Sequence, residues 1–221
     1  EYKNGNFNGR YRQWNKHNQF THILVDKNYK NGVLNGSYKK WFNDGEGQIE
    51  YDKNYKNGEL DGEYLEYRKI SIGFLRWEMT FKNGEKDGLR RLWSNDDLLE
   101  EGQYVMGKEN GLHKKAWRYS TYDHFSADRY FICNYLEGEM NGDYSKYEND
   151  FIIESGKYIN GKKHGIWKEW FLLGHLKKEG NYKNGEKHGE FVEFHDADFG
   201  PVETKSISTY LNGKKDGIHK E

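Results

Sequence analysis

The chain has 221 residues, with 35 basic and 36 acidic side chains and one cysteine, Cys133. This near-neutral balance argues against the strongly basic surface of most nucleic-acid-binding proteins, and one cysteine excludes an internal disulfide framework. Only 34% of the residues are hydrophobic although 17% are aromatic. The composition therefore lacks the aliphatic residues that fill the core of a compact globular domain.

A short motif recurs nine times: an aromatic residue, a glycine three positions later, and a second glycine four positions after the first. The copies begin 23 to 31 residues apart, at Tyr2, Tyr29, Tyr55, Phe81, Tyr104, Tyr135, Tyr158, Tyr182 and Tyr210. Self-similarity at such a period is typical of stacked supersecondary units. We therefore treat residues 1–221 as one array of repeats.

The motif predicts a tight turn. Asn precedes the first glycine in seven copies, with Met106 and Glu137 as the exceptions. Asn-Gly favours a turn in which both residues have positive φ. Asn, Asp or His precedes every second glycine, and these types also tolerate positive φ. We expect two left-handed positions in each copy, each formed by a residue pair.

A strand is predicted after each second glycine. An aromatic residue often stands two and again five positions after it, as do Tyr11 and Trp14 early in the chain and Trp167 and Trp170 later. Because three is an odd offset, either both strand faces carry an aromatic residue or a bulge brings the two to one face.

A second strand then returns to the next copy. Its glycine two positions before the motif aromatic, at Gly102, Gly156 and Gly180, leaves room for a neighbouring ring across the backbone. Each repeat is thus a β-hairpin, and consecutive hairpins pair edge to edge. The expected fold is all-β, an elongated, single-layer, twisted antiparallel sheet of about nine hairpins.

The pattern Tyr-x-Asn-Gly-x-x-x-Gly-x-Trp-x-x-Trp resembles the MORN repeat, in the longer form found in bacterial and large-virus proteins. The resemblance covers almost the whole chain, and the best copies lie between Tyr158 and Phe194. It implies an array of β-hairpins and non-enzymatic roles: binding of other proteins, self-association, and in some members binding of anionic lipids. Some bacterial relatives of this kind are antitoxin-like.

Variation between copies falls on the hairpin tips, opposite the Asn-Gly turns. Enlarged tips are expected at 15–21, 68–74, 118–128 and 195–202. Insertions in repeat proteins often form the binding surface. The tip at 118–128 is the longest and is rich in aromatic and polar side chains, although tolerance of loop length alone also explains an insertion. The predicted partner-binding residues are Trp117, Tyr119, Tyr122, Asp123, His124, Phe125 and Asp128.

Charge is unevenly distributed along the second half of the chain. Residues 123–156 contain eight acidic and two basic residues, and residues 157–188 contain eight basic and three acidic residues. A solvated sheet face, electrostatic steering of a partner, and docking of one copy on another are all compatible with this. The predicted basic patch comprises Lys162, Lys163, Lys168, Lys177, Lys178 and Lys187.

No chemistry-bearing constellation is recognisable, so we expect no enzyme, cofactor or metal site. His164 and His188 precede second glycines, where turn geometry already explains them. His195, Asp196 and Asp198 could ligate a metal, but one short loop is a weak signal. The chain has no segment apolar enough for a membrane helix and none resembling a signal peptide, which favours the cytoplasm, although a removed leader stays open.

The sequence thus predicts a non-enzymatic scaffold that binds another protein, as an inhibitor, antitoxin or immunity-type neutraliser. A peripheral module that binds anionic membrane lipids through the basic patch is the alternative, and binding of single-stranded nucleic acid is a weaker one. Both chain ends fall within a repeat, which suggests a shortened chain, absent termini, or a partner over an open end. Self-association through an end or a face follows as a further expectation.

Overall fold

The computed structural model describes residues 2–17, 20–70, 73–116, 128–196 and 203–220. These residues form β-strands and contain no helix. By its contacts the chain divides into two compact units, Glu1–Lys108 (unit 1) and Glu109–Glu221 (unit 2). The strands of unit 1 are β1 (Tyr2–Lys3), β2 (Asn6–Phe7), β3 (Gly9–His17), β4 (Phe20–Lys30), β5 (Val33–Trp41), β6 (Ile49–Lys56), β7 (Glu59–Ile70), β8 (Gly73–Lys82), β9 (Glu85–Lys86), β10 (Gly88–Ser94) and β11 (Asp97–Val105).

The boundary between the units falls in β12: Lys108, its first residue, belongs to unit 1, and the rest of the strand belongs to unit 2. The strands of unit 2 are β12 (Lys108–Ala116), β13 (Arg129–Leu136), β14 (Glu139–Glu148), β15 (Phe151–Ile159), β16 (Lys162–Trp170), β17 (Leu176–Lys183), β18 (Glu186–Phe194), β19 (Thr204–Leu211) and β20 (Lys214–Lys220).

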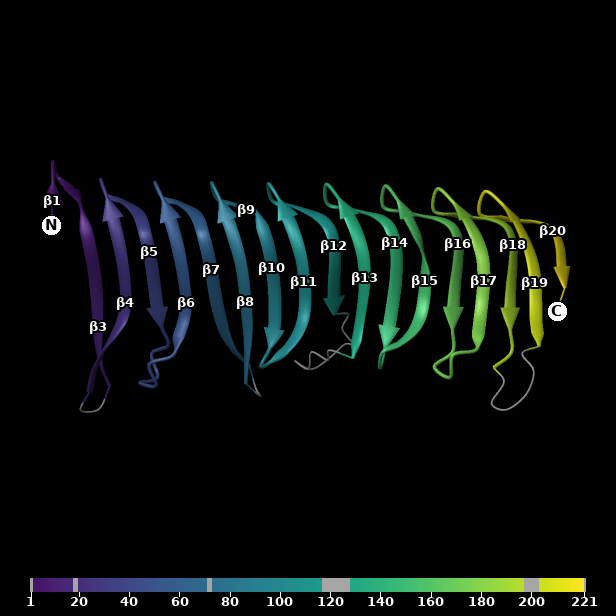
Figure 1. Cartoon of the computed structure of the whole chain (residues 1–221), viewed down its shortest axis with the longest axis horizontal. Helices are drawn as coiled ribbons and strands as arrows, with labels where there is room; N and C mark the ends of the chain where they lie inside the picture. The colour runs from purple at the N-terminus through teal and green to yellow at the C-terminus, as the bar shows by residue number, and fades with distance from the viewer. Residues whose placement is uncertain (1, 18–19, 71–72, 117–127, 197–202, 221) are drawn as a thin grey trace. The chain divides into compact units, whose positions relative to one another are not determined.

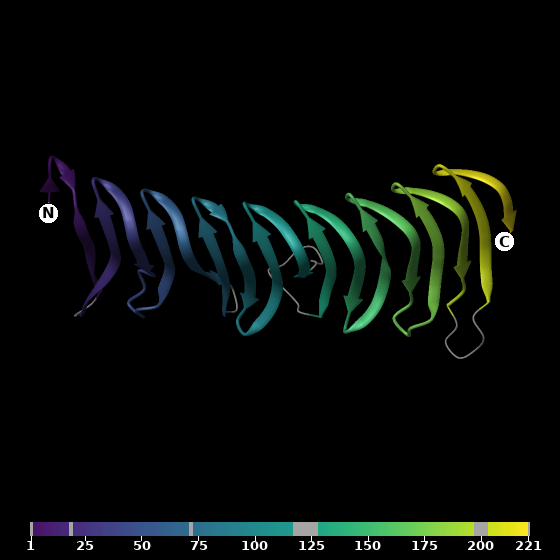
Figure 2. The ribbon, with the colours of Figure 1, turned by 45° about the horizontal axis from the view of Figure 1, so that its top comes forward.

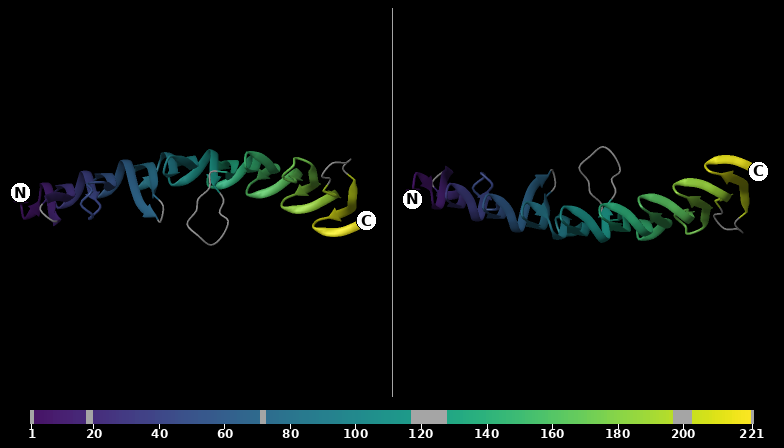
Figure 3. Two further views of the ribbon diagram at one scale, coloured as in Figure 1. Left: turned by 90° about the horizontal axis from the view of Figure 1, so that it is seen from below. Right: turned by 90° about the horizontal axis from the view of Figure 1, so that it is seen from above.

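Within each unit the hairpins pair edge to edge in sequence order. In unit 1, β3 to β8 pair successively and antiparallel, β10 then joins β8 to β11, and β9 extends the turn end of β8. In unit 2, β12 to β20 pair in the same way. The strands of each unit are curved (Figure 2), and no second layer of strands covers them in the described residues (Figure 3). The expected all-β antiparallel hairpin fold is confirmed.

The motif turns of each unit lie on one edge of its sheet, and the variable hairpin tips lie on the other (Figure 1). At the turn edge, both residues of each two-residue turn are left-handed, for example Asn31 (φ 52°) and Gly32 (φ 82°). Met106 (φ 48°) and Glu137 (φ 51°) adopt the same conformation where Asn is missing. The turn geometry is therefore kept even where the residue type is unfavourable.

The second glycine behaves differently from the expectation. It has positive φ, but the residue before it does not. In three copies of unit 1 the side chain of the preceding residue instead accepts a hydrogen bond from the next turn. The Asn8 Oδ1 accepts a hydrogen bond from the backbone N–H of Asn31 (2.8 Å), and Asp61 and Asp87 accept from Asn83 (3.3 Å) and Met106 (3.4 Å). At these three positions Asn or Asp thus acts as a side-chain acceptor and does not adopt a left-handed backbone.

Backbone bonds also connect each turn to the repeat before it. The N–H of Gly58 donates to the carbonyl of Leu34 (2.8 Å) in unit 1, and the N–H of Gly161 donates to that of Met140 (2.9 Å) in unit 2. In both cases the acceptor lies two residues before the preceding second glycine. The same bond forms at Gly32, Gly84, Gly107, Gly138, Gly185 and Gly213. We call this series the turn ladder.

The two aromatic residues of a repeat lie on opposite faces of the sheet. Trp167 pairs with Gly180, whereas Trp170 pairs with Leu176 after a register shift that leaves an extra residue, Lys177, in the return strand β17. Because the bulge is in the partner strand, alternation along β16 continues, and residues three apart point to opposite sides. We call the side of Trp167 the ring face and the side of Trp170 the back face.

The core of unit 2 lies on the ring face. Cys133, Tyr135, Tyr144 and Trp167 form a buried cluster, with Tyr158 and Tyr182 packed against it. Several neighbouring rings contact edge to face, as in the pair Tyr158–Trp167 with centroids 5.0 Å apart. The Trp167 ring covers Gly156 and the Phe191 ring covers Gly180 so closely that a Cβ would lie 2.2 Å and 2.1 Å from ring carbons. The predicted role of these two glycines is confirmed.

Two repeats of unit 1 have lysines, Lys27 and Lys53, where unit 2 has these small residues. The Lys27 Nζ lies over the rings of Tyr11 and Tyr38, and the Lys53 Nζ lies 4.7 Å from the Tyr64 ring centroid. Cation–π attraction offsets part of the cost of covering an ammonium group.

Two of the expected enlarged tips are mostly strand. Strand β7 continues to Ile70 and β8 starts at Gly73, so the described residues 68–70 and 73–74 are paired strand. Strands β3 and β4 likewise continue to His17 and from Phe20. Cross-strand pairing outweighed the irregular composition of these segments, because each added pair satisfies backbone groups that a loop would leave to water.

Candidate protein interface

The tip between β16 and β17 is a well-defined loop that exposes two leucines. The N–H of Phe171 donates to the carbonyl of His175, and the N–H of Gly174 donates to that of Phe171, each at 2.9 Å. These bonds close the loop, and Gly174 supplies its positive φ (87°). Leu172 and Leu173 are 53% and 66% exposed. The loop thus presents apolar side chains on a constrained backbone.

The neighbouring tip, between β14 and β15, adds a third apolar side chain. Asn149 and Asp150 are both left-handed (φ 51° and 63°) and bring the chain sharply to Phe151, which is 58% exposed. The N–H of Asn149 donates to the carbonyl of Asp128 (2.8 Å), so the end of the preceding tip is tied to this one. We call the three side chains of Phe151, Leu172 and Leu173 the apolar tips.

A depression of about 420 Å³ lies beside the apolar tips. Ile153 and Glu148 line it from the β14–β15 hairpin, and Trp170, Phe171 and Leu172 line it from the next hairpin. Lys146, Glu154, Glu169 and Lys177 complete the wall. This arrangement combines an apolar surface with charges of both signs, as protein interfaces do.

Of the predicted partner-binding residues, the structure describes Asp128 alone. Asp128 is exposed at the start of β13 and is joined to Asn149 through its carbonyl. Trp117, Tyr119, Tyr122, Asp123, His124 and Phe125 lie outside the described residues. The apolar tips were missed by the sequence analysis, which looked for long insertions. The signal for them is the run Phe171-Leu172-Leu173 before Gly174, since a solvated tip needs no leucines.

The six predicted basic-patch lysines are largely engaged within unit 2. Three form ion pairs: Lys163 with Glu154 (2.7 Å), Lys168 with Glu179 (2.9 Å) and Lys178 with Glu193 (3.1 Å). Lys187 lies 4.7 Å from the Tyr210 ring centroid, and Lys177 lies 5.8 Å from that of Phe171. Lys162 is exposed near the turn edge.

These lysines also do not gather on one side of the sheet. Lys163 lies 3.8 Å from the Trp167 ring centroid and therefore on the ring face. Lys168 follows Trp167 directly along β16, so it lies on the back face with Glu179. The positive charge of this segment is thus divided between two faces and partly neutralised.

Burial and hydrogen bonds shift the pKa values of several groups, as three examples show. Burial raises the pKa of the Cys133 thiol to about 11, and its side chain has no exposed surface. The hydrogen bond from Lys178 lowers the pKa of Glu193. In unit 1, the hydrogen bond from the Arg10 guanidinium lowers the pKa of Asp26, and Arg12 adds a second bond.

Among the described residues, no group of three or more His, Cys, Asp or Glu side chains is arranged to hold a metal ion. Within the same residues no helix has the length and apolar character needed to cross a membrane. No protein-family model matches the sequence, and no match was found among curated proteins.

Proposed function

We propose that this chain is a non-catalytic scaffold that binds another protein, and that the apolar tips of unit 2 form part of the contact surface. One observation carries the proposal: three large apolar side chains, each more than half exposed, stand on neighbouring tips with defined backbones. Exposed apolar clusters on a folded surface are typical of interaction sites. A constrained loop also loses little conformational entropy on binding.

The biological outcome we propose is neutralisation of the bound protein, in the manner of an inhibitor or antitoxin. This part rests on the resemblance of the repeats to MORN repeats. Each unit offers several tips of independent length on one edge of its sheet, which suits recognition of a protein surface.

Anionic membrane lipid is the competing partner. Binding of such a surface relies on several uncompensated basic residues near one plane. Lys163, Lys168 and Lys178 are paired with glutamates and lie on two faces, so the described geometry favours a protein partner.

The experiment begins with capture of the partner by the immobilised chain from a lysate of its source organism, followed by purification of the captured protein. Binding is then measured by titration calorimetry for the wild type and for the double variant Leu172→Ser/Leu173→Ser. Loss of two buried leucine contacts should weaken binding about tenfold or more. Leu136→Ser is the matched control, because Leu136 is also 54% exposed but lies at the turn edge of unit 2.

Equal affinity of the double variant and the wild type would show that Leu172 and Leu173 are not part of the interface. Deletion of residues 118–128 tests the long tip in the same assay. Flotation with phosphatidylserine vesicles at low and high salt tests the lipid alternative, and salt-sensitive flotation that is lost in Lys162→Glu/Lys187→Glu would favour it.

A further inference from the structure

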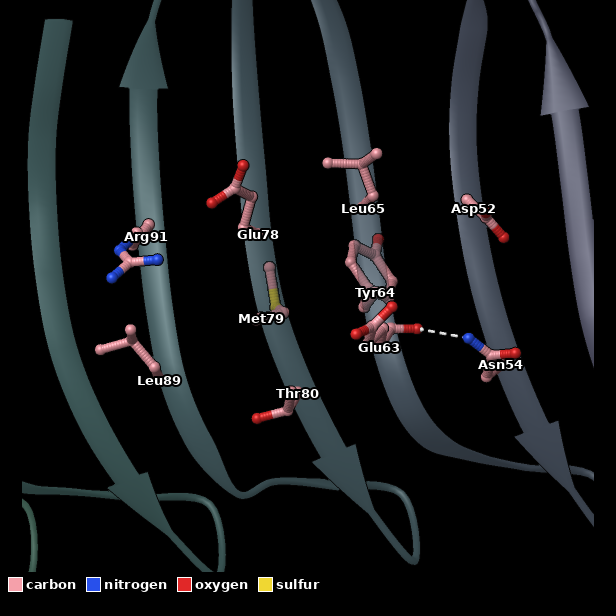
Figure 4. Close-up of a pocket in the computed structure, with 10 residues that line it drawn as sticks. All are labelled: Asp52, Asn54, Glu63, Tyr64, Leu65, Glu78, Met79, Thr80, Leu89 and Arg91. Atoms are coloured by element: carbon pink, nitrogen blue, oxygen red, sulfur yellow. Dashed lines mark hydrogen bonds between the residues drawn. The ribbon is translucent and has the colours of Figure 1, made fainter.

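A depression lies on the back face of unit 1. It has a volume of about 380 Å³ and is formed by four adjacent strands, β6, β7, β8 and β10 (Figure 4). This volume lies at the lower end of ligand sites and suits a single side chain better than a cofactor.

The depression forms where two short side chains, Thr80 and Asn54, are hydrogen-bonded to the backbone between longer side chains. Thr80 pairs with Glu63 and donates its hydroxyl to the carbonyl of Asp87. The Asn54 amide donates to the carbonyl of Glu63 (3.2 Å), as Figure 4 shows. Leu89 stands on the far side of Thr80 and also lines the space. Thr80 and Asn54 are thus fixed against the sheet, which leaves a hollow between Glu63 and Leu89.

Most of the charges in the lining are compensated within unit 1. Asp52 bonds Lys39 (2.7 Å), and Arg91 bonds Glu101 (2.6 Å). The carboxylate of Glu78 bonds the Arg76 guanidinium (3.1 Å) and accepts from the Trp93 indole N–H. These pairs cancel one another's charge locally.

Glu63 is different. Its carboxylate is exposed and has no ion-pair partner within the part of the chain that the structure describes. Leu65 lies two residues further along β7 on the same face, and Leu89 lies across Thr80. A ligand with an apolar stem and a positive end satisfies both features, because the stem covers the leucines and the charge meets Glu63.

We propose that this depression binds a lysine or arginine side chain of the partner protein. The inference rests on the proposed function, since it assigns the side chain to the protein that the scaffold binds. A phosphate or an anionic lipid headgroup is disfavoured here, because the one uncompensated charge in the lining is negative.

The test uses the full chain with labelled leucine methyl groups and two acetylated, amidated pentapeptides, Gly-Gly-Lys-Gly-Gly and the same peptide with norleucine for lysine. The lysine peptide should shift the Leu65 and Leu89 methyl signals saturably at millimolar concentration. Norleucine keeps the apolar stem but lacks the ammonium group. The norleucine peptide should therefore bind at least about fivefold more weakly than the lysine peptide. Raised salt should weaken only the lysine peptide.

Glu63→Gln should reduce the affinity for the lysine peptide to that of the norleucine peptide. Glu190→Gln is the matched control, because Glu190 also follows a second glycine but lies in unit 2. Equal binding of both peptides, shifts confined to other leucines, or full affinity in Glu63→Gln would overturn the inference. The methyl spectrum of each variant reports its folding directly. Failure here leaves the calorimetric result for Leu172 and Leu173 unchanged, so the two proposals fail independently.

Discussion

The ring of Trp167 lies flat against the backbone of Gly156, and its indole N–H donates to the carbonyl of Lys157 (3.2 Å). Gly156 has no positive φ. It is therefore required for space and not for backbone conformation.

Gly156→Ala should destabilise the protein by about 1–3 kcal/mol, because the new methyl group would overlap the indole and force Trp167 out of its position. Urea unfolding followed by tryptophan fluorescence measures the effect. Ser155→Ala, on the other face of β15, is the control and should lie within about 0.5 kcal/mol of the wild type. Equal midpoints for Gly156→Ala and the wild type would contradict the packing described.

Asn8→Ala should cost about 1 kcal/mol, since it leaves the N–H of Asn31 without its side-chain acceptor. Asn35 occupies the same slot in the next repeat, and the described structure gives its side chain no hydrogen bond. Asn35→Ala should therefore cost less. The same urea titration compares the two, and a larger effect at Asn35 would show that this slot acts through the backbone.

Glu137→Asn should stabilise unit 2 by about 1 kcal/mol, because Glu137 is held at φ 51° and Asn tolerates that conformation better. The reciprocal change Asn160→Glu, in the next turn of the same unit, should destabilise by a similar amount. Thermal unfolding by circular dichroism measures both. If both variants shift the melting temperature in the same direction, the turn conformation does not explain the residue preference.

Stability should fall as Asp26 is protonated. Its folded pKa is lowered by the bond from Arg10, so the ionised form stabilises the fold above the unfolded pKa and that contribution is lost as pH drops through the folded value. Between about pH 5 and about pH 3, Asp26→Asn should show a smaller loss of urea midpoint than the wild type. Glu101→Gln, which removes an exposed ion pair with Arg91, should retain the wild-type slope.

Cys133 should resist thiol reagents in the folded protein. Its side chain is fully buried, and burial raises its pKa to about 11, so little thiolate forms at neutral pH. Reaction with a chromogenic disulfide reagent should proceed rapidly only in denaturant. Stoichiometric labelling of the native protein within minutes would indicate that the ring face opens readily.

The sequence predicts the turn edge well because local chemistry decides it. Positive φ at Asn31 and Gly32 follows from the two residue types alone, and the small residue under a ring at Gly156 follows from spacing. The partners of Asn8 and Lys163 could not be predicted, because they lie in the adjacent repeat. The opposite faces of Trp167 and Trp170 depended on a bulge in β17, which the sequence left open.

The candidate site was harder to predict than the fold. Charge counts placed a positive segment at 157–188, but pairing of Lys168 with Glu179 and of Lys178 with Glu193 is set by strand register. Loop length led to the prediction of a partner-binding site at 118–128, whereas the apolar tips Phe151, Leu172 and Leu173 stand at short connections between strands. Length is a signal of tolerance, and only composition distinguished Leu172 and Leu173 from solvated residues.

The turn ladder fixes the distance along the sheet between one motif and the next within each unit, because each turn glycine from Gly32 onward is bonded to the repeat before it. Copies of the motif nevertheless start 23 to 31 residues apart. The difference in chain length must therefore be taken up at the tips. Tip loops can thus lengthen or shorten during evolution while the strands keep their register and the fold stays the same.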